Sequence, residues 1–518
     1  MTRVSALAVV LTFLLPSAAA LPLQTQPSHE PDLEAWFEAQ WRKRDLKPSP
    51  TCDDATFLRR VSLDLVGMVP APDEVRSFLK SSKREKRAKK IDDLLASPEA
   101  AEYFAHLWVQ WLMGHDIEFR DLRRLDLGGL CLWLKKAWTE DLPYDEFVNA
   151  FLSASGKLSD NPPANYLAKH LVPGEPPAGL ARATARLFLG RDLRCAQCHD
   201  HPFDATTQEE FWAYAAFFRP LRSGNGRVDE VPVHKPDPLR DDLGELFVEP
   251  KFLDGRGLED NEPRGAGIAR LFLTMENDAV ARALVDRYWR LYFGRSLLPA
   301  KHSKGQPDLL DLLTRSFRAG KGSLRSLART MVSLRAYQLS SEGPEALREG
   351  YAIGPLKMMN TTQFMRVWNH AFQWEPYFRA QYEKNPEKMA FFKDPEVFWM
   401  VRTMQAKELL FPKGRDPEEV LSSGTDRLAI KLMNNRDIQL LMVSQFSLVQ
   451  KVTKLTADPE RRLDELFLLM VSRLPTKAEK TRLVDHVRTA GNPAHAYVDG
   501  YADVFWMLFN STEFVFVG

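Results

Sequence analysis

Two cysteines and a histidine near the middle of the chain have a spacing that can do chemistry. Cys195, Cys198 and His199 form the pattern C-x-x-C-H. Two thiols three positions apart can each add to one vinyl group of the same porphyrin, and the adjacent histidine can then reach the iron from one face. The spacing therefore predicts covalent attachment of haem c through both cysteines, with His199 as the axial ligand.

The residues that follow the motif leave other cofactors open. His201 and Asp204 could orient His199 through hydrogen bonds, or they could ligate a metal themselves. The alternative cofactor is zinc or another divalent metal, held by the two cysteines and a pair among His199, His201 and His234. Asp204 could equally cap a helix. A local disulfide between the two cysteines would need no cofactor, and a thioredoxin-like pair would need a strand–helix context that is missing here.

A second axial ligand for a haem iron is not evident from the sequence. The candidates by residue type are His106, His115, His234, Met113 and Met275. An open sixth position would allow small-ligand or peroxide chemistry, whereas a filled position would favour electron transfer.

Composition and charge narrow the class of protein. The chain has 518 residues, long enough for several domains, with 44% apolar and 27% charged residues, as in ordinary globular proteins. The net charge of +1, from 70 basic and 69 acidic residues, gives no reason to expect nucleic acid as a partner. The sequence contains no G-x-S-x-G, H-E-x-x-H or G-x-x-x-x-G-K-[ST] motif.

The N-terminus has the pattern of a secretory signal peptide. Arg3 is followed by a mostly apolar stretch at residues 4–15 and by three alanines at 18–20. This pattern predicts a signal peptide over residues 1–20, cleaved after Ala20. No later run reaches about 18 uninterrupted apolar residues, so no transmembrane segment is expected in the mature chain. We therefore expect an exported protein, periplasmic or secreted, in which Cys52 and Cys131 could form a disulfide.

The periodicity of apolar residues predicts a mainly α fold. A helix is expected to begin after Ser97, with Pro98 in its first turn, and another is expected at 207–218. The apolar residues at helical spacing in the first of these are expected to pack in the core: Phe104, Leu107, Trp108, Trp111 and Leu112.

The character of the sequence changes between residues 219 and 264. Prolines and glycines are frequent there, and 228–233 and 246–252 resemble two short strands. Helices are expected again from 265 onward, including 279–293. The architecture predicted is therefore two helical domains, 33–218 and 265–518, with a small β-hairpin-like element between them at 219–264.

Several stretches resemble two bacterial domain families. Those similar to domain of unknown function 1549, a planctomycete cytochrome-c-type domain, are 57–67, 91–98, 195–204 and 250–255. Those similar to its usual partner, domain of unknown function 1553, are 284–289, 293–295, 432–435 and 505–514. The resemblance implies that 33–218 is the first domain and 265–518 the second.

Three functions are compatible with these observations. The first is an exported haem c protein that exchanges electrons with a redox partner. The second is a metal-dependent hydrolase of an extracellular polymer, with His199, His201 and Asp204 around a zinc-like ion. The third is a structural surface protein in which the Cys–His cluster fastens the fold.

Overall fold

The computed structural model describes most of the chain beyond residue 29. The described residues are 30–114, 117–172, 177–203, 205–231, 239–241, 244–246, 248–298, 306–373, 379–380, 383, 395–400, 433–434, 442, 447–490 and 496–518. The predicted signal peptide at 1–20 lies outside them. Helices predominate, and the strands form only small antiparallel sheets, so the predicted mainly α fold is confirmed. Among the described residues, no helix combines the length and the apolar character needed to cross a bilayer.

The N-terminal half of the chain is a succession of helices. They are α1 (Glu30–Lys43), α2 (Asp54–Val66), α3 (Pro72–Lys80), α4 (Lys86–Leu95), α5 (Pro98–Met113), α6 (Phe119–Arg124), α7 (Leu127–Thr139), α8 (Tyr144–Leu152), α9 (Ala164–His170), α10 (Ala178–Leu189), the 3-10 turn η1 (Cys195–Gln197) and α11 (Gln208–Ala216). The Ser97 side chain accepts a hydrogen bond from the Ala100 amide at 3.2 Å, which confirms the predicted start of α5. Thr207 and Glu210 form a capping box at α11.

A small β element is formed mostly by strands that follow α11, together with β1, which lies between α8 and α9. Strands β1 (Gly156–Lys157), β2 (Leu221–Gly224) and β3 (Arg227–Glu230) form an antiparallel sheet in the order β1-β3-β2, and β4 (Leu239–Asp241) pairs with β5 (Gly244–Leu246). Asn225 and Gly226 both have positive φ and join β2 to β3 in a two-residue hairpin turn.

One of the two predicted strands of this region is wrong. Of the first predicted strand, 228–233, residues 228–230 lie in β3. The second prediction, 246–252, fails because β5 ends at Leu246 and residues 248–252 lie outside any strand. Phe252 is buried instead against Phe272, with ring centroids 5.0 Å apart. The apolar residues that suggested a strand therefore serve packing against helices.

The C-terminal half is also helical. Its elements are α12 (Arg264–Leu273), η2 (Glu276–Asp278), α13 (Ala279–Phe293), α14 (Pro307–Ala319), α15 (Leu324–Ser333), α16 (Arg335–Gln338), α17 (Glu345–Glu349), β6 (Lys357–Met358), α18 (Thr361–Phe372), α25 (Leu448–Leu455), α26 (Pro459–Val471), α27 (Lys477–Thr489), α28 (Ala496–Phe509), α29 (Thr512–Val515) and β7 (Phe516–Val517). Strands β6 and β7 pair antiparallel. The predicted helix at 279–293 is confirmed.

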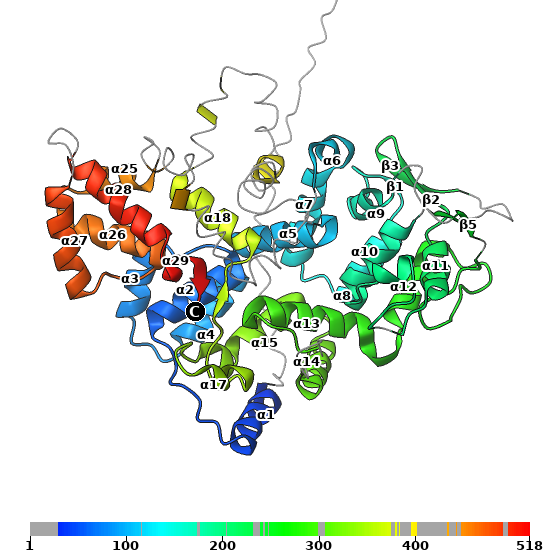
Figure 1. The fold of residues 1–518 in the computed structure, drawn as a ribbon, viewed down its shortest axis with the longest axis horizontal. Helices are drawn as coiled ribbons and strands as arrows, with labels where there is room; N and C mark the ends of the chain where they lie inside the picture. The colour runs from blue at the N-terminus through cyan, green and yellow to red at the C-terminus, as the bar shows by residue number, and fades with distance from the viewer. Residues whose placement is uncertain are drawn as a thin grey trace, which may run out of the picture.

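The buried apolar side chains form two clusters. The larger runs from Leu33 to Ala352 and adds Met400 and Leu468. The smaller lies around α18 and α25 to α29, and α2 contributes Leu63 to it. Figure 1 shows α25 to α28 gathered at one end of the molecule, and α11 with β2 and β3 at the other. The larger cluster contains residues from both sides of the predicted boundary between 264 and 265. The predicted domain boundaries remain a prediction from the sequence.

A buried polar group connects these parts of the chain. The Asp64 carboxylate, on α2, accepts hydrogen bonds from the Tyr337 hydroxyl at 2.7 Å, from Lys357 Nζ at 2.6 Å and from Gln363 Nε2 at 3.1 Å. Its side chain is fully buried. Four elements, α2, α16, β6 and α18, thus meet at one carboxylate.

Candidate functional site

The C-x-x-C-H motif forms a turn between α10 and α11. Helix α10 ends at Gly190, which has the left-handed conformation favoured at this position. The amides of Cys198 and His199 both donate to the Cys195 carbonyl at 3.2 Å, which closes the turn. Both cysteines are exposed and carry free thiols.

The residues between the two cysteines anchor this turn. Ala196 is fully buried, and the Gln197 carbonyl accepts from Trp212 Nε1 at 3.1 Å and from Gln208 Nε2 at 3.2 Å, both on α11. The Gln197 side chain is bonded by Arg182 from α10. Two helices therefore hold the middle of the motif, while the reactive thiols stay accessible.

His199 has one ring nitrogen available for a ligand. Its Nδ1 lies 2.7 Å from the Asp200 carbonyl oxygen. Because a carbonyl can only accept, Nδ1 carries a proton, so in the neutral ring it is Nε2 that keeps the lone pair. Among the described residues, Nε2 of His199 has no hydrogen-bond partner. This is the tautomer that an axial histidine needs, with its second nitrogen oriented by a backbone carbonyl.

His201 is arranged differently. Its Nε2 lies 2.9 Å from the Asp192 carbonyl and therefore carries the proton, whereas Nδ1 accepts from the Phe203 amide at 3.2 Å. Its own amide donates to the Thr206 carbonyl at 2.9 Å. Both ring nitrogens thus hold the loop, and in this geometry neither offers a lone pair to a metal. Asp204, the other residue predicted to assist, lies outside the described residues.

The motif opens onto a hollow of about 750 Å³. Most of the residues that line it carry polar or charged side chains: Gly190, Arg191, Asp192, Arg194, Cys195, Cys198, His199, His201 and Phe203. The volume lies within the range of small-molecule and cofactor sites. Phe203, 80% exposed, is the large apolar side chain of this lining. The two thiols, the available Nε2 and the room beside them fit a haem held at the surface.

The candidates for a second axial ligand do not line this hollow where they are described. His106 and Met113 are each 1% exposed and lie in α5, and Met275 packs against the larger cluster. His115 and His234 lie outside the described residues. Cys52 and Cys131 are both buried, the first before α2 and the second within α7, and the disulfide that the sequence allowed between them is not formed in this structure.

Comparison with protein families finds matches for two stretches of the chain. Residues 32–223 match the family described as PSCyt2, protein of unknown function (DUF1549). Residues 264–360 match the family described as PSD1, protein of unknown function (DUF1553). The chain carries a DUF1549 region followed by a DUF1553 region. The resemblance and the domain order predicted from the sequence are confirmed. No curated protein and no solved structure is significantly similar to the chain.

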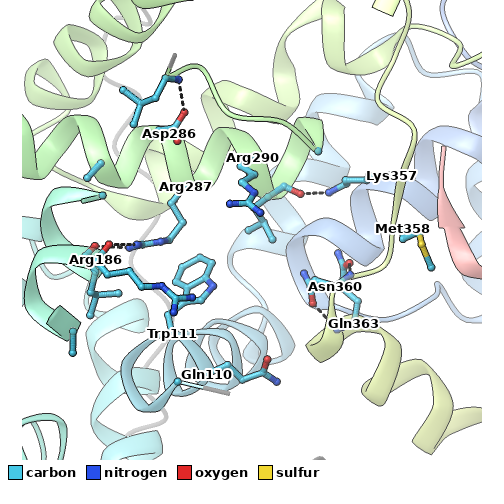
Figure 2. A pocket seen from close by; sticks show the side chains of 18 of the residues that line it. Gln110, Trp111, Arg186, Asp286, Arg287, Arg290, Lys357, Met358, Asn360 and Gln363 are labelled. Carbon is cyan, nitrogen blue, oxygen red and sulfur yellow. Dashed lines mark hydrogen bonds between the residues drawn. The ribbon is translucent and has the colours of Figure 1, made fainter. Parts of the chain in front are cut away.

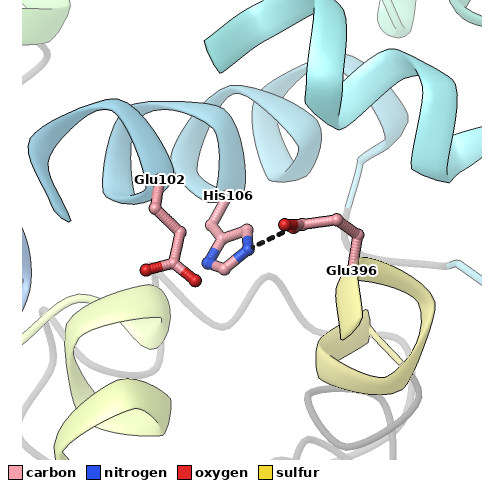
Figure 3. A group of neighbouring side chains, drawn as sticks. All are labelled: Glu102, His106 and Glu396. Carbon is pink, nitrogen blue, oxygen red and sulfur yellow. Dashed lines mark hydrogen bonds and ion pairs between the residues drawn. The ribbon is translucent and has the colours of Figure 1, made fainter. Parts of the chain in front are cut away.

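The DUF1549 region holds the C-x-x-C-H turn, and it also contributes to a largely buried group that the sequence motifs do not indicate. Glu102 and His106 on α5 meet Glu396, with ligand-type atoms within 4.8 Å of one another (Figure 3). Among the described residues, no other three side chains of His, Cys, Asp or Glu bring their ligand-type atoms this close together. The donors that line the C-x-x-C-H hollow therefore lie further apart than those of this group. The Glu-x-x-x-His spacing on one helix face was the available sequence signal.

Hydrogen bonds and basic residues already satisfy this buried group. His106 Nε2 lies 2.8 Å from Glu396, and its Nδ1 accepts from Arg366 at 3.1 Å. Arg366 also pairs with Glu102 at 3.1 Å, and Lys135 pairs with Glu396. Both nitrogens of His106 are therefore occupied, which favours an ion-pair network over a metal site.

The electrostatics of the network agree with this description. Burial works to raise the pKa of Glu396, but the hydrogen bond from His106 and the pairing with Lys135 outweigh it and lower that pKa to about 2. Burial lowers the pKa of His106, and its bond to Glu396 opposes this only in part. The network therefore holds an ionised carboxylate and a neutral imidazole at neutral pH.

Proposed function

We propose that this chain is an exported protein that binds haem c covalently through Cys195 and Cys198, with His199 as an iron ligand, and that it transfers electrons. One observation carries the proposal. An anchored turn presents two exposed thiols beside a histidine whose Nε2 has no partner among the described residues. A bound haem would supply one-electron redox chemistry at its iron.

The residues of the turn have separate tasks in this proposal. The two thiols would hold the porphyrin as thioethers, and the Asp200 carbonyl would fix the orientation of His199 through Nδ1. Arg191 and Arg194 would lie beside the cofactor, where cations suit acidic propionate groups. An exposed cofactor edge would give a redox partner protein direct access, which electron transfer requires.

A divalent metal such as zinc is the second candidate. It is favoured by the presence of two thiols and two imidazoles in the lining of one hollow. His201 would first have to give up its bonds to Asp192 and Phe203. A metal there would support either hydrolysis of an extracellular polymer or a purely structural role at the cell surface.

The test is to express the protein by export in a host that matures c-type cytochromes. A pyridine haemochrome spectrum and elemental analysis are recorded for the wild type, for Cys195→Ala/Cys198→Ala and for His201→Gln. We expect a covalent haem band in the wild type and in His201→Gln, and its loss in the double cysteine variant.

The matched histidine variant separates the two candidates. Stoichiometric zinc without haem, lost in both His201→Gln and the cysteine variant, would overturn the haem proposal. In that case the purified protein would be screened for hydrolysis of polysaccharides, and loss of stability on chelation without turnover would favour the structural role.

A further inference from the structure

A second cavity lies apart from the C-x-x-C-H turn. Its volume is about 340 Å³, and its walls come from the end of α5, from α10, from α13 and from the segment that joins β6 to α18. Figure 2 shows Arg287 and Arg290 reaching toward this space from α13, Arg186 from α10, and Gln110 and Trp111 from α5. The volume suits a ligand of the size of a monosaccharide.

The cavity lining is strongly basic. Three arginines and Lys357 contribute to it, against Asp286 as the acidic residue. Asp286 is already used, because its carboxylate accepts from the Ser296 hydroxyl at 2.8 Å and from the Leu298 amide at 3.2 Å. Lys357 is likewise paired with Asp64. The arginines therefore determine the electrostatic character that a ligand would meet.

Two of these arginines differ in how firmly they are held. Arg287 donates to the carbonyls of Leu187 at 2.7 Å and Arg186 at 3.0 Å, and its guanidinium lies 5.5 Å from the Trp111 ring centre. Arg290, one helical turn further along α13, is exposed, and its side chain makes no hydrogen bond or ion pair with any described residue. Arg287 thus helps to build the wall, while the guanidinium of Arg290 is available to a ligand.

A buried amide in the same cavity also lacks a partner. Gln110 is only 5% exposed, and its Nε2 has no hydrogen-bond partner among the described residues. Leaving a buried donor unsatisfied costs free energy, so a ligand oxygen at this place would be favoured. This observation is independent of the arginines and points to the same kind of ligand.

We propose that this cavity binds a small organic oxyanion, a molecule of monosaccharide size that carries a carboxylate, sulfate or phosphate group. Arg290 binds the anionic oxygens, because a guanidinium matches their planar, two-pronged geometry. Gln110 donates to a further ligand oxygen, and Trp111 offers the apolar surface of its ring. The proposal does not depend on haem, since none of these residues belongs to the C-x-x-C-H motif.

The test uses the exported, mature chain and calorimetric titration with three probes: glucuronate, inorganic sulfate and neutral glucose. Variants Arg290→Gln and Gln110→Leu are compared with Arg461→Gln, whose side chain is 78% exposed on α26 and does not line the cavity. We expect glucuronate to bind most tightly, sulfate more weakly and glucose not at all. Each cavity variant should weaken glucuronate binding by about tenfold or more, the usual effect of losing a hydrogen bond to a charged group.

The unliganded variants supply the check on folding. Gln110→Leu should keep the melting temperature of the unliganded wild type, because it replaces an unsatisfied amide by an apolar group of similar size. Sulfate binding that also disappears in Cys195→Ala/Cys198→Ala would place the anion at the other hollow and overturn the proposal. Glucuronate binding that is equal in wild type, Arg290→Gln and Arg461→Gln, or equal binding of glucose, would overturn it as well.

Discussion

Replacing Asp64 by asparagine tests whether one carboxylate joins the DUF1549 region to the DUF1553 region. The variant keeps the shape of the side chain but removes its charge. Lys357, with 9% of its side chain exposed, would then stay buried without its counter-ion. Breaking a buried ion pair by removing one partner costs about 3–5 kcal/mol of unfolding free energy. The weakened bonds from Tyr337 and Gln363 act in the same direction.

The effect of Asp64→Asn should also depend on pH. Burial lowers the pKa of Lys357, and Asp64 opposes this, so the variant lowers that pKa further. Between the pKa of Lys357 in the folded chain and its higher pKa in the unfolded chain, the unfolded chain binds more protons. The free energy of unfolding therefore rises with pH in this interval. The deficit of the variant is therefore full below the folded pKa of Lys357 and fades as the pH rises through it.

The assay is urea unfolding followed by tryptophan fluorescence, with Asp64→Asn/Lys357→Met as a double variant and Asp73→Asn as the matched surface control. Asp73 is 98% exposed in its pair with Arg76, so its replacement should cost less than about 1 kcal/mol. The double variant should recover most of the loss, since it leaves no unpaired charge. A cost for Asp64→Asn no larger than for Asp73→Asn, or simple additivity in the double variant, would refute the reasoning.

Three further predictions concern the loop, the buried network and the domains. His201→Gln removes two hydrogen bonds of the imidazole ring, each worth about 1 kcal/mol. Hydrogen exchange of the backbone amides around His201 should therefore quicken at least fivefold, and unchanged exchange would contradict the role of this ring in holding the loop. Lys135→Met should raise the pKa of Glu396 from about 2 toward its ordinary 4.5. The stability from Glu396 is lost as pH falls from 4.5 toward 2, so the acid-unfolding midpoint by fluorescence should move to higher pH; an unmoved midpoint would count against the network. Residues 32–223 expressed alone should lack sharp near-ultraviolet circular dichroism, because α10 and α5 lose contact with later helices; a native-like spectrum would show an independent domain.

Local signals in the sequence predicted the helices well. Ser97 places a side-chain oxygen over the first turn of α5, and the structure shows this cap. Such caps depend on neighbours within three residues, so a short stretch of sequence suffices to recognise them. The strand predicted at 246–252 was wrong because apolar residues such as Phe252 give the same pattern in a buried loop as in a strand.

The residues of the candidate site were also recognisable from their spacing, but their individual states were not. The motif alone treats His199 and His201 as similar imidazoles. The structure distinguishes them, because the Asp192 carbonyl, on the far side of the turn, engages Nε2 of His201, whereas the ring of His199 bonds the next carbonyl along the chain through Nδ1.

The sequence by itself determined the helical class, the domain order and the position of the C-x-x-C-H turn, all of which depend on residues close together in the chain. Only the tertiary structure decided which distant side chains meet. His106 and Glu396 are separated by 290 positions, and Gln110, Arg290 and Trp111 face one cavity from two helices far apart in sequence. Such encounters depend on how buried helices pack, and the free energy of that packing is shared by the whole core.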